Sequence, residues 1–265
     1  MKNNKAIILV GFGTSNTEAI KKCIDPIENE IREVYGSEYL VFKCFTSKII
    51  LRKLSNDFGV NILHFEEALR NAKLNCCTEV VIIPLNVLHG NEYEKIKEFV
   101  SKYNHEFNKI ILGKPILQLD NQTKGIAFSN IVEGIKNELP KDKNLLLVGH
   151  GTTNKSDEVY SLFQKELSKM NYENVLIGTL EGKISINEIV DKIIIRDIRE
   201  ITIVPFLSVS GIHITRDIFG ENKDSWKCMI EDQGVKVKCF NKSLTELLSV
   251  KRLYIENIKE LINEL

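Results

Sequence analysis

Two histidines and two glutamates lie in short loops beside glycines, where they could bind a metal ion or move protons. His150 lies between two glycines in the segment VGHGT, and His213 lies in SGIHI. Glu92 belongs to HGNEYEK and Glu181 to VLIGTLEGKI. Imidazoles and a carboxylate form a ligand set suited to divalent first-row metals such as cobalt, nickel, iron or zinc. A neutral imidazole, with a pKa near ~6.5, can also serve as a general base.

Each of these residues also has an ordinary structural interpretation. The flanking glycines leave His150 without covering side chains, which favours a site role over a structural hydrogen bond, whereas His213 taken alone fits either. Glu92 could be a first-turn glutamate favoured by the helix dipole, and Glu181 an exposed loop residue. Because the chain contains no HExxH or other sequential ligand cluster, metal ligands would come from separate loops and form an open site.

These residues belong to an internal repeat. The first pair of matching segments is AIILVGFGTSN and LLLVGHGTTN, and the second is EVVIIPLNVLHGNEY and EITIVPFLSVSGIHI. In this alignment Phe12 corresponds to His150 and Glu92 to His213, so equivalent positions carry different groups. The repeat predicts two similar half-chains related by a pseudo-twofold axis. An active-site cleft is expected between them, where small-molecule sites prefer to lie.

The glycine loop GFGTSN does not favour a nucleotide site. It lacks the third glycine of GxGxxG and the GK[ST] of a P-loop. A plain interpretation is a tight turn into a helix that Thr14, Ser15 or Asn16 caps. Because the turn occurs twice, we favour loops whose backbone N–H and hydroxyl groups hold the carboxylates of an acidic ligand. No GxSxG elbow of a serine hydrolase is present.

Short apolar runs alternate with amphipathic stretches along the chain. The expected strands are 6–10, 39–45, 79–84, 108–112, 144–148, 174–179, 200–205 and 235–239. The expected helices are 17–34, 64–74, 92–103, 124–138, 155–169, 185–195 and 244–264. Continuously apolar, β-branched strands are typical of parallel sheets covered on both faces. The pattern predicts an α/β fold with two four-stranded, flavodoxin-like or Rossmann-like lobes.

A polar, proline-bearing connection at 139–142 marks the expected boundary between the lobes. We therefore expect an N-terminal lobe over 1–140 and a C-terminal lobe over 141–265, whose last helix could cross back onto the first lobe. Both glycine motifs and both proline–glycine segments follow strands directly. Because ligands in open α/β sheets bind outside the carboxyl ends of strands, all four loops are expected to face one cleft.

Composition excludes several classes of function. The 265 residues are 43% hydrophobic and 27% charged, and the formal net charge is zero, so no nucleic-acid or membrane partner is expected. The N-terminal apolar run is too short for a signal peptide, and no stretch approaches the ~20 residues of a membrane helix. Six cysteines without CxxC spacing favour free thiols over zinc or disulfides. A cytoplasmic protein is the expectation.

Taken together, the motifs resemble the anaerobic sirohydrochlorin cobaltochelatases of the class II chelatase superfamily. The matching pieces, in chain order, are GFGTSN, FTSKIILRKL, GNEYEKI, VGHGT, GTLEG, SGIHI and DSWK. The resemblance implies two flavodoxin-like lobes and ATP-independent insertion of Co²⁺ into a sirohydrochlorin-type tetrapyrrole, on the oxygen-independent route to cobalamin. No organic cofactor is implied, and a homo-oligomer is compatible with the sequence.

By position, the resemblance makes His150 both a metal ligand and the base that removes pyrrole protons. His213 and Glu181 would complete the metal set, and Glu92 would assist proton removal or metal delivery. The residues implied in substrate binding are Gly13, Thr14, Ser15, Gly151, Thr152 and His89.

One departure from the family concerns the metal. Where members often read GDHA this chain reads GIHI, so Ile212 removes an acidic neighbour that would tune the orientation or basicity of His213. The same ligand types accept Ni²⁺ and Fe²⁺, which leaves a ferro- or nickelochelatase open. A non-catalytic carrier of metal or tetrapyrrole also stays open. A periplasmic-binding-like sensor is disfavoured by the two site histidines and the missing signal sequence.

Overall fold

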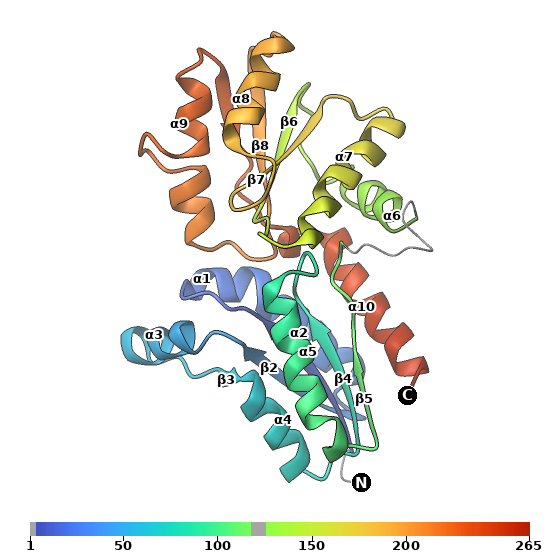
Figure 1. Ribbon diagram of the computed structural model, residues 1–265. Helices are drawn as coiled ribbons and strands as arrows, with labels where there is room; N and C mark the ends of the chain where they lie inside the picture. The colour runs from blue at the N-terminus through green and yellow to red at the C-terminus, as the bar shows by residue number, and fades with distance from the viewer. Residues whose placement is uncertain (1–3, 118–125) are drawn as a thin grey trace. The chain divides into compact units, whose positions relative to one another are not determined.

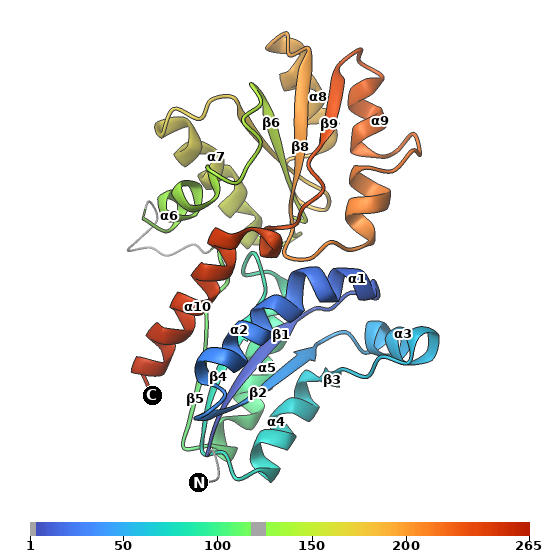
Figure 2. The ribbon, with the colours of Figure 1, turned by 180° about the vertical axis from the view of Figure 1, so that it is seen from behind.

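The computed structural model describes residues 4–117 and 126–265, with every side chain among them except those of 126–130. Two compact units make up the chain: Met1–Ile116 together with Lys251–Leu265, and Leu117–Val250. In each unit, helices cover both faces of a parallel sheet, as the opposite views of Figures 1 and 2 show. The predicted α/β fold class with two parallel sheets is therefore confirmed.

The first unit contains a five-stranded sheet in the order β3-β2-β1-β4-β5. Its strands are β1 (Lys5–Gly11), β2 (Tyr39–Phe45), β3 (Leu63–His64), β4 (Glu79–Pro84) and β5 (Lys109–Leu112). Its helices are α1 (Thr17–Ala19), the π-helix η1 (Ile20–Ile24), α2 (Asp25–Tyr35), α3 (Lys48–Phe58), α4 (Phe65–Leu74), α5 (Asn91–Tyr103) and the 3-10 helix η2 (Asn104–Glu106).

The second unit contains a four-stranded sheet in the order β7-β6-β8-β9. Its strands are β6 (Leu145–Gly149), β7 (Val175–Thr179), β8 (Glu200–Phe206) and β9 (Lys236–Cys239). The helices are α6 (Ile126–Ile135), η3 (Lys155–Asp157), α7 (Glu158–Lys169), α8 (Ile186–Ile195), the π-helix η4 (His213–Ile218), α9 (Trp226–Glu231) and η5 (Leu244–Glu246). The last helix, α10 (Leu248–Asn263), begins here and continues into the first unit.

The two sheets repeat one strand order and one register. Without the short strand β3, the first sheet runs β2-β1-β4-β5 and the second runs β7-β6-β8-β9. Val10 of β1 pairs with Pro84, and Val148 of β6 pairs with Pro205 at the equivalent step. The order of strands reverses beside β1 and beside β6. Ligands of open α/β sheets bind at such switch points, outside the carboxyl ends of the strands.

Burial on both faces explains why the strands are continuously apolar. The central residues 6–10 of β1 and 80–83 of β4 have no exposed surface, and 146–148 of β6 are equally buried. Because side chains alternate between the two faces of a strand, both sets must be apolar when helices cover both faces. Six of the predicted strands lie within one residue of the observed bounds at each end, and the other two, 39–45 and 79–84, coincide with β2 and β4.

Five elements were not expected from the sequence: β3, α3, η2, η4 and α9. The first sheet therefore has five strands rather than four. β3 has two residues and α9 six, too few for a periodic pattern to be recognised. α3 is longer, but Leu54 is its one buried residue, so its apolar face is weak.

The helix expected over 17–34 is interrupted by a π-helical turn. α1 leads into η1, and the N–H of Asp25 donates to the carbonyl of Ile20, five residues earlier. Pro26 follows at the start of α2, where its missing N–H costs no helical hydrogen bond. Of the helix expected over 124–138, residues 124 and 125 lie outside the described part of the chain, and α6 starts at Ile126. Within residues 4–117 and 126–265, no helix combines the length and apolar character needed to cross a bilayer.

The division of the chain differs from the expected boundary near residue 140. The first unit ends at Ile116, and residues 251–265 return to it. There the chain end lies against β5, because Lys109 Nζ donates to the backbone carbonyl of Glu264. A Cβ placed on Gly113 would lie 3.0 Å from Leu261 of α10. The C-terminal helix thus contributes to the core of the first unit.

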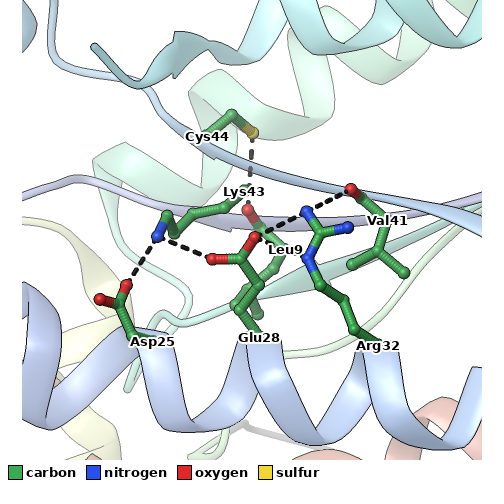
Figure 3. Close-up of polar contacts among 7 residues, drawn as sticks. All are labelled: Leu9, Asp25, Glu28, Arg32, Val41, Lys43 and Cys44. Carbon is green, nitrogen blue, oxygen red and sulfur yellow. Dashed lines mark hydrogen bonds and ion pairs between the residues drawn. The ribbon is translucent and has the colours of Figure 1, made fainter. Parts of the chain in front are cut away.

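An ion-pair cluster joins α2 to β2 in the first unit (Figure 3). Lys43 Nζ lies 2.6 Å from Asp25 Oδ1 and 2.7 Å from Glu28 Oε2. Arg32 lies 2.7 Å from Glu28 and donates at 2.7 Å to the carbonyl of Val41. Burial by itself raises the pKa of Glu28, but hydrogen bonds from Lys43 and Arg32 outweigh it and lower that pKa. The carboxylate is therefore held in its charged form.

Candidate functional site

The backbone places His150 and Glu181 on adjacent loops of the second unit. β6 ends at Gly149 and β7 ends at Thr179, which pair directly in the sheet. Two further hydrogen bonds extend this ladder, from Leu180 N–H to Gly149 O at 3.0 Å and from Glu181 N–H to His150 O at 2.7 Å. Glu181 Oε2 consequently lies 3.8 Å from His150 Nδ1. The two predicted site residues are neighbours.

His213 joins them from the loop after β8. It is the first residue of the π-helix η4, and its ring centroid lies 4.9 Å from that of His150, with the ring planes at 85°. The side chains of His150, His213 and Glu181 are 43%, 35% and 60% exposed, so each can reach a ligand from solution. Among the described residues, however, no three His, Cys, Asp or Glu side chains are already arranged to hold a metal ion.

The hydrogen bonds of the two imidazoles determine which nitrogen each presents. His150 Nδ1 lies 3.2 Å from the carbonyl oxygen of Gly151, and His213 Nδ1 lies 2.7 Å from Asp217 Oδ2. Carbonyl and carboxylate oxygens accept hydrogen bonds, so Nδ1 of each neutral ring carries the proton. The lone pair is then on Nε2. Both rings can offer this atom to a metal ion or a proton.

A buried carboxylate that was not predicted holds the site loops together. Asp157 is 1% exposed; its Oδ1 accepts from Thr152 N–H at 3.0 Å, and its Oδ2 accepts from Lys183 N–H at 2.7 Å. A Cβ on Gly182 would lie 2.2 Å from Asp157 Oδ1, so only glycine fits there. The signal available in the sequence was the repeat, in which Asp157 replaces Ala19.

The second glycine of each GxGT motif has a left-handed conformation. φ is +107° at Gly13 and +79° at Gly151. A Cβ would lie 2.6 Å from the Phe45 ring at Gly13 and 2.4 Å from the backbone nitrogen of Gly182 at Gly151. Glycine is therefore required at both predicted substrate-binding positions for reasons of backbone geometry and close packing.

The hydroxyl groups predicted to face the substrate differ in exposure. Thr14 and Thr152 are buried, at 6% and 9% exposure, while Ser15 is half-buried. Thr14 Oγ1 accepts from Asn16 N–H at 3.2 Å. Asn16 is the cap of α1 and accepts from Glu18 N–H and Ala19 N–H at 3.1 and 3.2 Å. Of the three alternatives for the cap, Asn16 is the residue that takes this role.

Glu92 and His89 belong to the first unit, on and just before α5. Glu92 Oε2 accepts from Thr46 Oγ1 at 3.4 Å, and its Oε1 lies 2.6 Å from Lys95 Nζ. His89 Nε2 contacts Glu94 Oε1, and the hydrogen bond from His89 is the main cause that lowers the pKa of Glu94. Glu92 keeps 32% of its side chain exposed, so its first-turn position does not prevent contact with a ligand.

The fold and the site together define the class of protein. Two α/β units share one strand order, and two imidazoles with a carboxylate lie at the strand ends of one of them, which suits a protein that handles a divalent metal ion. The chain belongs to the cobalt chelatase (CbiK) family, whose sequence profile matches residues 5–263. It is therefore a metal chelatase.

Known proteins of similar sequence and structure agree with this assignment. A sirohydrochlorin cobaltochelatase of Salmonella typhimurium is 23% identical over 262 residues, which cover 98% of this chain and 97% of the relative. Sirohydrochlorin cobaltochelatase CbiKC of Nitratidesulfovibrio vulgaris is 24% identical over 236 residues, with coverage of 88% and 81%. The cobalt complex of the sirohydrochlorin chelatase SirB from Bacillus subtilis subspecies spizizenii matches with a TM-score of 0.65 and 15% identity, covering 99% of this chain and 96% of that chain. The last likeness is one of fold.

Proposed function

We propose that this chain inserts Co²⁺ into sirohydrochlorin, without ATP and with release of two pyrrole protons, in anaerobic cobalamin biosynthesis. Membership of the cobalt chelatase family supports the metal, and the two relatives named as sirohydrochlorin cobaltochelatases support the tetrapyrrole. Within this chain, the observation that carries the proposal is the pair of His150 and His213, whose ring centroids are 4.9 Å apart.

The reaction must remove two pyrrole protons while a dication is transferred to the macrocycle. We assign His150 as metal ligand and as acceptor of one pyrrole proton. Because its Nδ1 faces the Gly151 carbonyl, the single lone pair on Nε2 serves the two roles in turn, first for the ion and then for the proton once the ion has passed to the macrocycle. A neutral imidazole can do both. His213 supplies a second nitrogen ligand. Glu181, 3.8 Å from His150, supplies a carboxylate that offsets the charge of the incoming ion.

We assign the remaining predicted residues to the tetrapyrrole. The loops that carry Gly13, Ser15 and Gly151 lie at carboxyl ends of strands, where acidic groups of a ligand can meet backbone N–H groups. Thr14 contributes through its backbone, since its side chain is buried. Thr152 is also buried and its N–H donates to Asp157, so it contributes by fixing the loop beside Gly151. Glu92 and His89, partly exposed on the first unit, are proposed to assist proton removal and to line the substrate site.

The same donors accept other ions. Affinity for imidazole and carboxylate sites follows a generic order among divalent first-row metals, so Ni²⁺ and Fe²⁺ are proposed as competing ions. We infer that Co²⁺ is the metal substrate from the family description. Competition assays with equal concentrations of Co²⁺, Ni²⁺ and Fe²⁺ measure the preference.

The proposal is tested by anaerobic incubation of the protein with sirohydrochlorin and Co²⁺, following the absorbance change of the macrocycle. We expect multiple turnovers for the wild type and a loss of at least about 100-fold for His150→Ala, the range that general acid–base catalysis contributes. His105→Ala is the matched control, because His105 is 76% exposed and lies in η2 of the first unit.

Three outcomes separate the hypotheses. Turnover that survives in His105→Ala and is lost in His150→Ala supports a chelatase centred on His150. Stoichiometric binding of metal or tetrapyrrole without turnover would instead identify a carrier. Unimpaired chelation by His150→Ala would show that the assignment of the base and ligand is wrong.

A further inference from the structure

Asp217, which is not among the predicted site residues, lies beside His213, one of the proposed metal ligands. Asp217 Oδ2 lies 2.7 Å from His213 Nδ1. We propose that Asp217 is a positioning residue for metal insertion, which holds the His213 ring in the orientation and tautomer that offer Nε2 to the incoming ion. The inference rests on the proposed function, because it assigns Asp217 a part in the same metal site.

The π-helix η4 carries both partners of this contact. His213 is the first residue of η4 and Asp217 is the fifth, and the N–H of Phe219 donates to the carbonyl of Ile214, five residues earlier. Residues four apart lie on the same face of a helix, so the two side chains can meet, as the distance of 2.7 Å shows. Short π-helical segments are frequent at functional sites.

The carboxylate is itself held in place. Arg216 Nε donates to Asp217 Oδ1 at 2.6 Å, and Arg216 Nη2 donates to Oδ2 at 3.3 Å. One oxygen is therefore occupied mainly by the guanidinium and the other by the imidazole. Asp217 is 27% exposed and His213 is 35% exposed, so the pair is partly shielded from water.

The direction of the hydrogen bond follows from the partners. An ionised carboxylate only accepts, so His213 Nδ1 must donate, and Nε2 of the neutral ring keeps the lone pair. Metal-binding histidines commonly donate their second N–H to a carboxylate in this way, which fixes the ring and raises its donor strength. His150 reaches the same state through the carbonyl of Gly151. Both rings thus present the same nitrogen by two different means.

Asp217 also supplies the acidic neighbour that His213 lacks at position 212. Ile212 is 60% exposed and brings no charge to the neighbouring histidine. The carboxylate comes instead from position 217, one helical turn further along the chain. The acidic partner of His213 is present, although the position before the histidine does not supply it.

A spectroscopic measurement on the wild type tests the tautomer directly. In the metal-free protein, ¹⁵N chemical shifts of the histidine rings, recorded above the ordinary pKa of imidazole, distinguish protonated from unprotonated ring nitrogens. We expect His213 with the proton on Nδ1. A proton on Nε2 would overturn the proposal without any variant being made.

The matched pair of variants is Asp217→Asn and Asp197→Asn. Asp197 also lies in the second unit and pairs with an arginine, Arg199, but it precedes β8 rather than following it. Its φ of +51° is one that asparagine tolerates. For Asp217→Asn we expect affinity for Co²⁺ alone, measured by calorimetry, to fall about 10-fold or more, as for other carboxylates behind metal-binding histidines. The apparent KM for Co²⁺ should rise similarly and the KM for sirohydrochlorin should not.

The readouts separate positioning from other effects. Weaker Co²⁺ binding in Asp217→Asn with the wild-type tautomer would show a charge effect and overturn positioning. Equal losses in Asp197→Asn, or unchanged Co²⁺ affinity in Asp217→Asn, would overturn it too. If the wild type fails to turn over sirohydrochlorin, the proposed function fails, but the tautomer and the Co²⁺ titration still decide whether Asp217 positions His213.

Discussion

The two units of this chain share a scaffold and differ in the groups it carries. Both have the same core strand order, and in both the central strand pairs a valine with a proline at the equivalent register step. Both place a left-handed glycine two residues after that strand. At equivalent loop positions, however, the first unit has Phe12 and the second has His150. A repeated backbone has therefore kept its geometry while equivalent positions carry different groups, Phe12 against His150 and Glu92 against His213.

The two units also differ in the side chain that donates a hydrogen bond to one equivalent backbone carbonyl. Val41 of β2 and Val175 of β7 are equivalent by register. Arg32 donates to the carbonyl of Val41 as part of an ion-pair cluster (Figure 3). The neutral Gln164 donates at 2.8 Å to the carbonyl of Val175 and accepts at 2.8 Å from Ile177 N–H. The equivalent carbonyl thus accepts a hydrogen bond from a charged side chain in the first unit and from a neutral side chain in the second.

The loops after the central strands show the clearest divergence. In the second unit Asp157 binds Thr152 N–H and Lys183 N–H, so the loops that carry His150 and Glu181 are joined. The equivalent residue in the first unit is Ala19, which has no side-chain acceptor. We conclude that the second unit needs a rigid pair of loops because it carries the candidate metal ligands.

The largest effect is expected from an alanine at the left-handed glycines. Gly151→Ala should destabilise the protein by about 3 kcal/mol, because left-handed backbone costs ~1–2 kcal/mol and the new Cβ meets backbone. Gly13→Ala should cost about 1 kcal/mol less, since its Cβ meets the buried side chain of Phe45 rather than backbone. Thermal unfolding midpoints of both variants measure the difference. Equal shifts would mean that the two loops are equally constrained.

The second largest loss of stability is expected for a substitution of Asp157. Asp157→Ala leaves two N–H groups without their acceptor and should cost about 2–3 kcal/mol, since each unsatisfied buried donor costs ~1–3 kcal/mol. Chelatase activity should fall further than stability alone explains, because the loops of His150 and Glu181 lose their connection. Asp191→Ala, at an exposed position of α8, is the control for stability and rate. If Asp157→Ala is as active as the control, the anchoring of the loops does not contribute to catalysis.

The ionic cluster should make the first unit sensitive to acid. Glu28→Gln should cost about 2 kcal/mol at neutral pH, less than the loss of one partner from a fully buried pair. The pKa of Glu28 is lowered in the folded protein, so its contribution is present above the unfolded value of about 4.3 and is lost as pH falls through the folded value. The difference in unfolding midpoint between wild type and Glu28→Gln should therefore shrink on acidification. A difference that stays constant with pH would contradict this account.

The smallest loss of stability is expected for Gln164, the neutral counterpart of Arg32 in the second unit. Gln164→Met removes two hydrogen bonds to β7 but introduces no buried charge. It should cost about 1–2 kcal/mol, because both bonds are only part-buried and β7 is an edge strand. Because no ionisable group is involved, the difference from wild type should not change with pH. A pH-dependent difference would indicate that the second unit has an ionic contact equivalent to that of Glu28.

Much of the fold was predictable because its signals are local. Apolar β-branched runs identify strands that are buried on both faces, and the repeat identifies two similar units. The two-residue strand β3 and the exposed helix α3 escaped prediction because neither has enough buried residues to produce a period. The units divide at residue 116 rather than near residue 140, because a change in composition marks a turn, while the packing of residues 251–265 defines the first unit.

Prediction of the candidate site was limited in the same way, to what local patterns in the sequence indicate. His150, His213 and Glu181 were identified from their types and their glycine neighbours, and the second sheet brings them together. Asp217 lies at helical spacing from His213, but the sequence did not indicate that a helix begins at His213. Asp157 is an ordinary aspartate in the sequence. Its role appears only when two loops, 26 residues apart along the chain, meet at its carboxylate.

The sequence by itself determined the class of fold, the internal repeat, the family and the types of the site residues. These depend on residue type and on spacing along the chain, which the covalent order contains. Tertiary structure decided which nitrogen each histidine presents, which carboxylate holds which loop, and where the C-terminal helix packs. The reason is physical: hydrogen-bond direction and burial depend on distances between residues that are far apart in sequence, and only folding sets those distances.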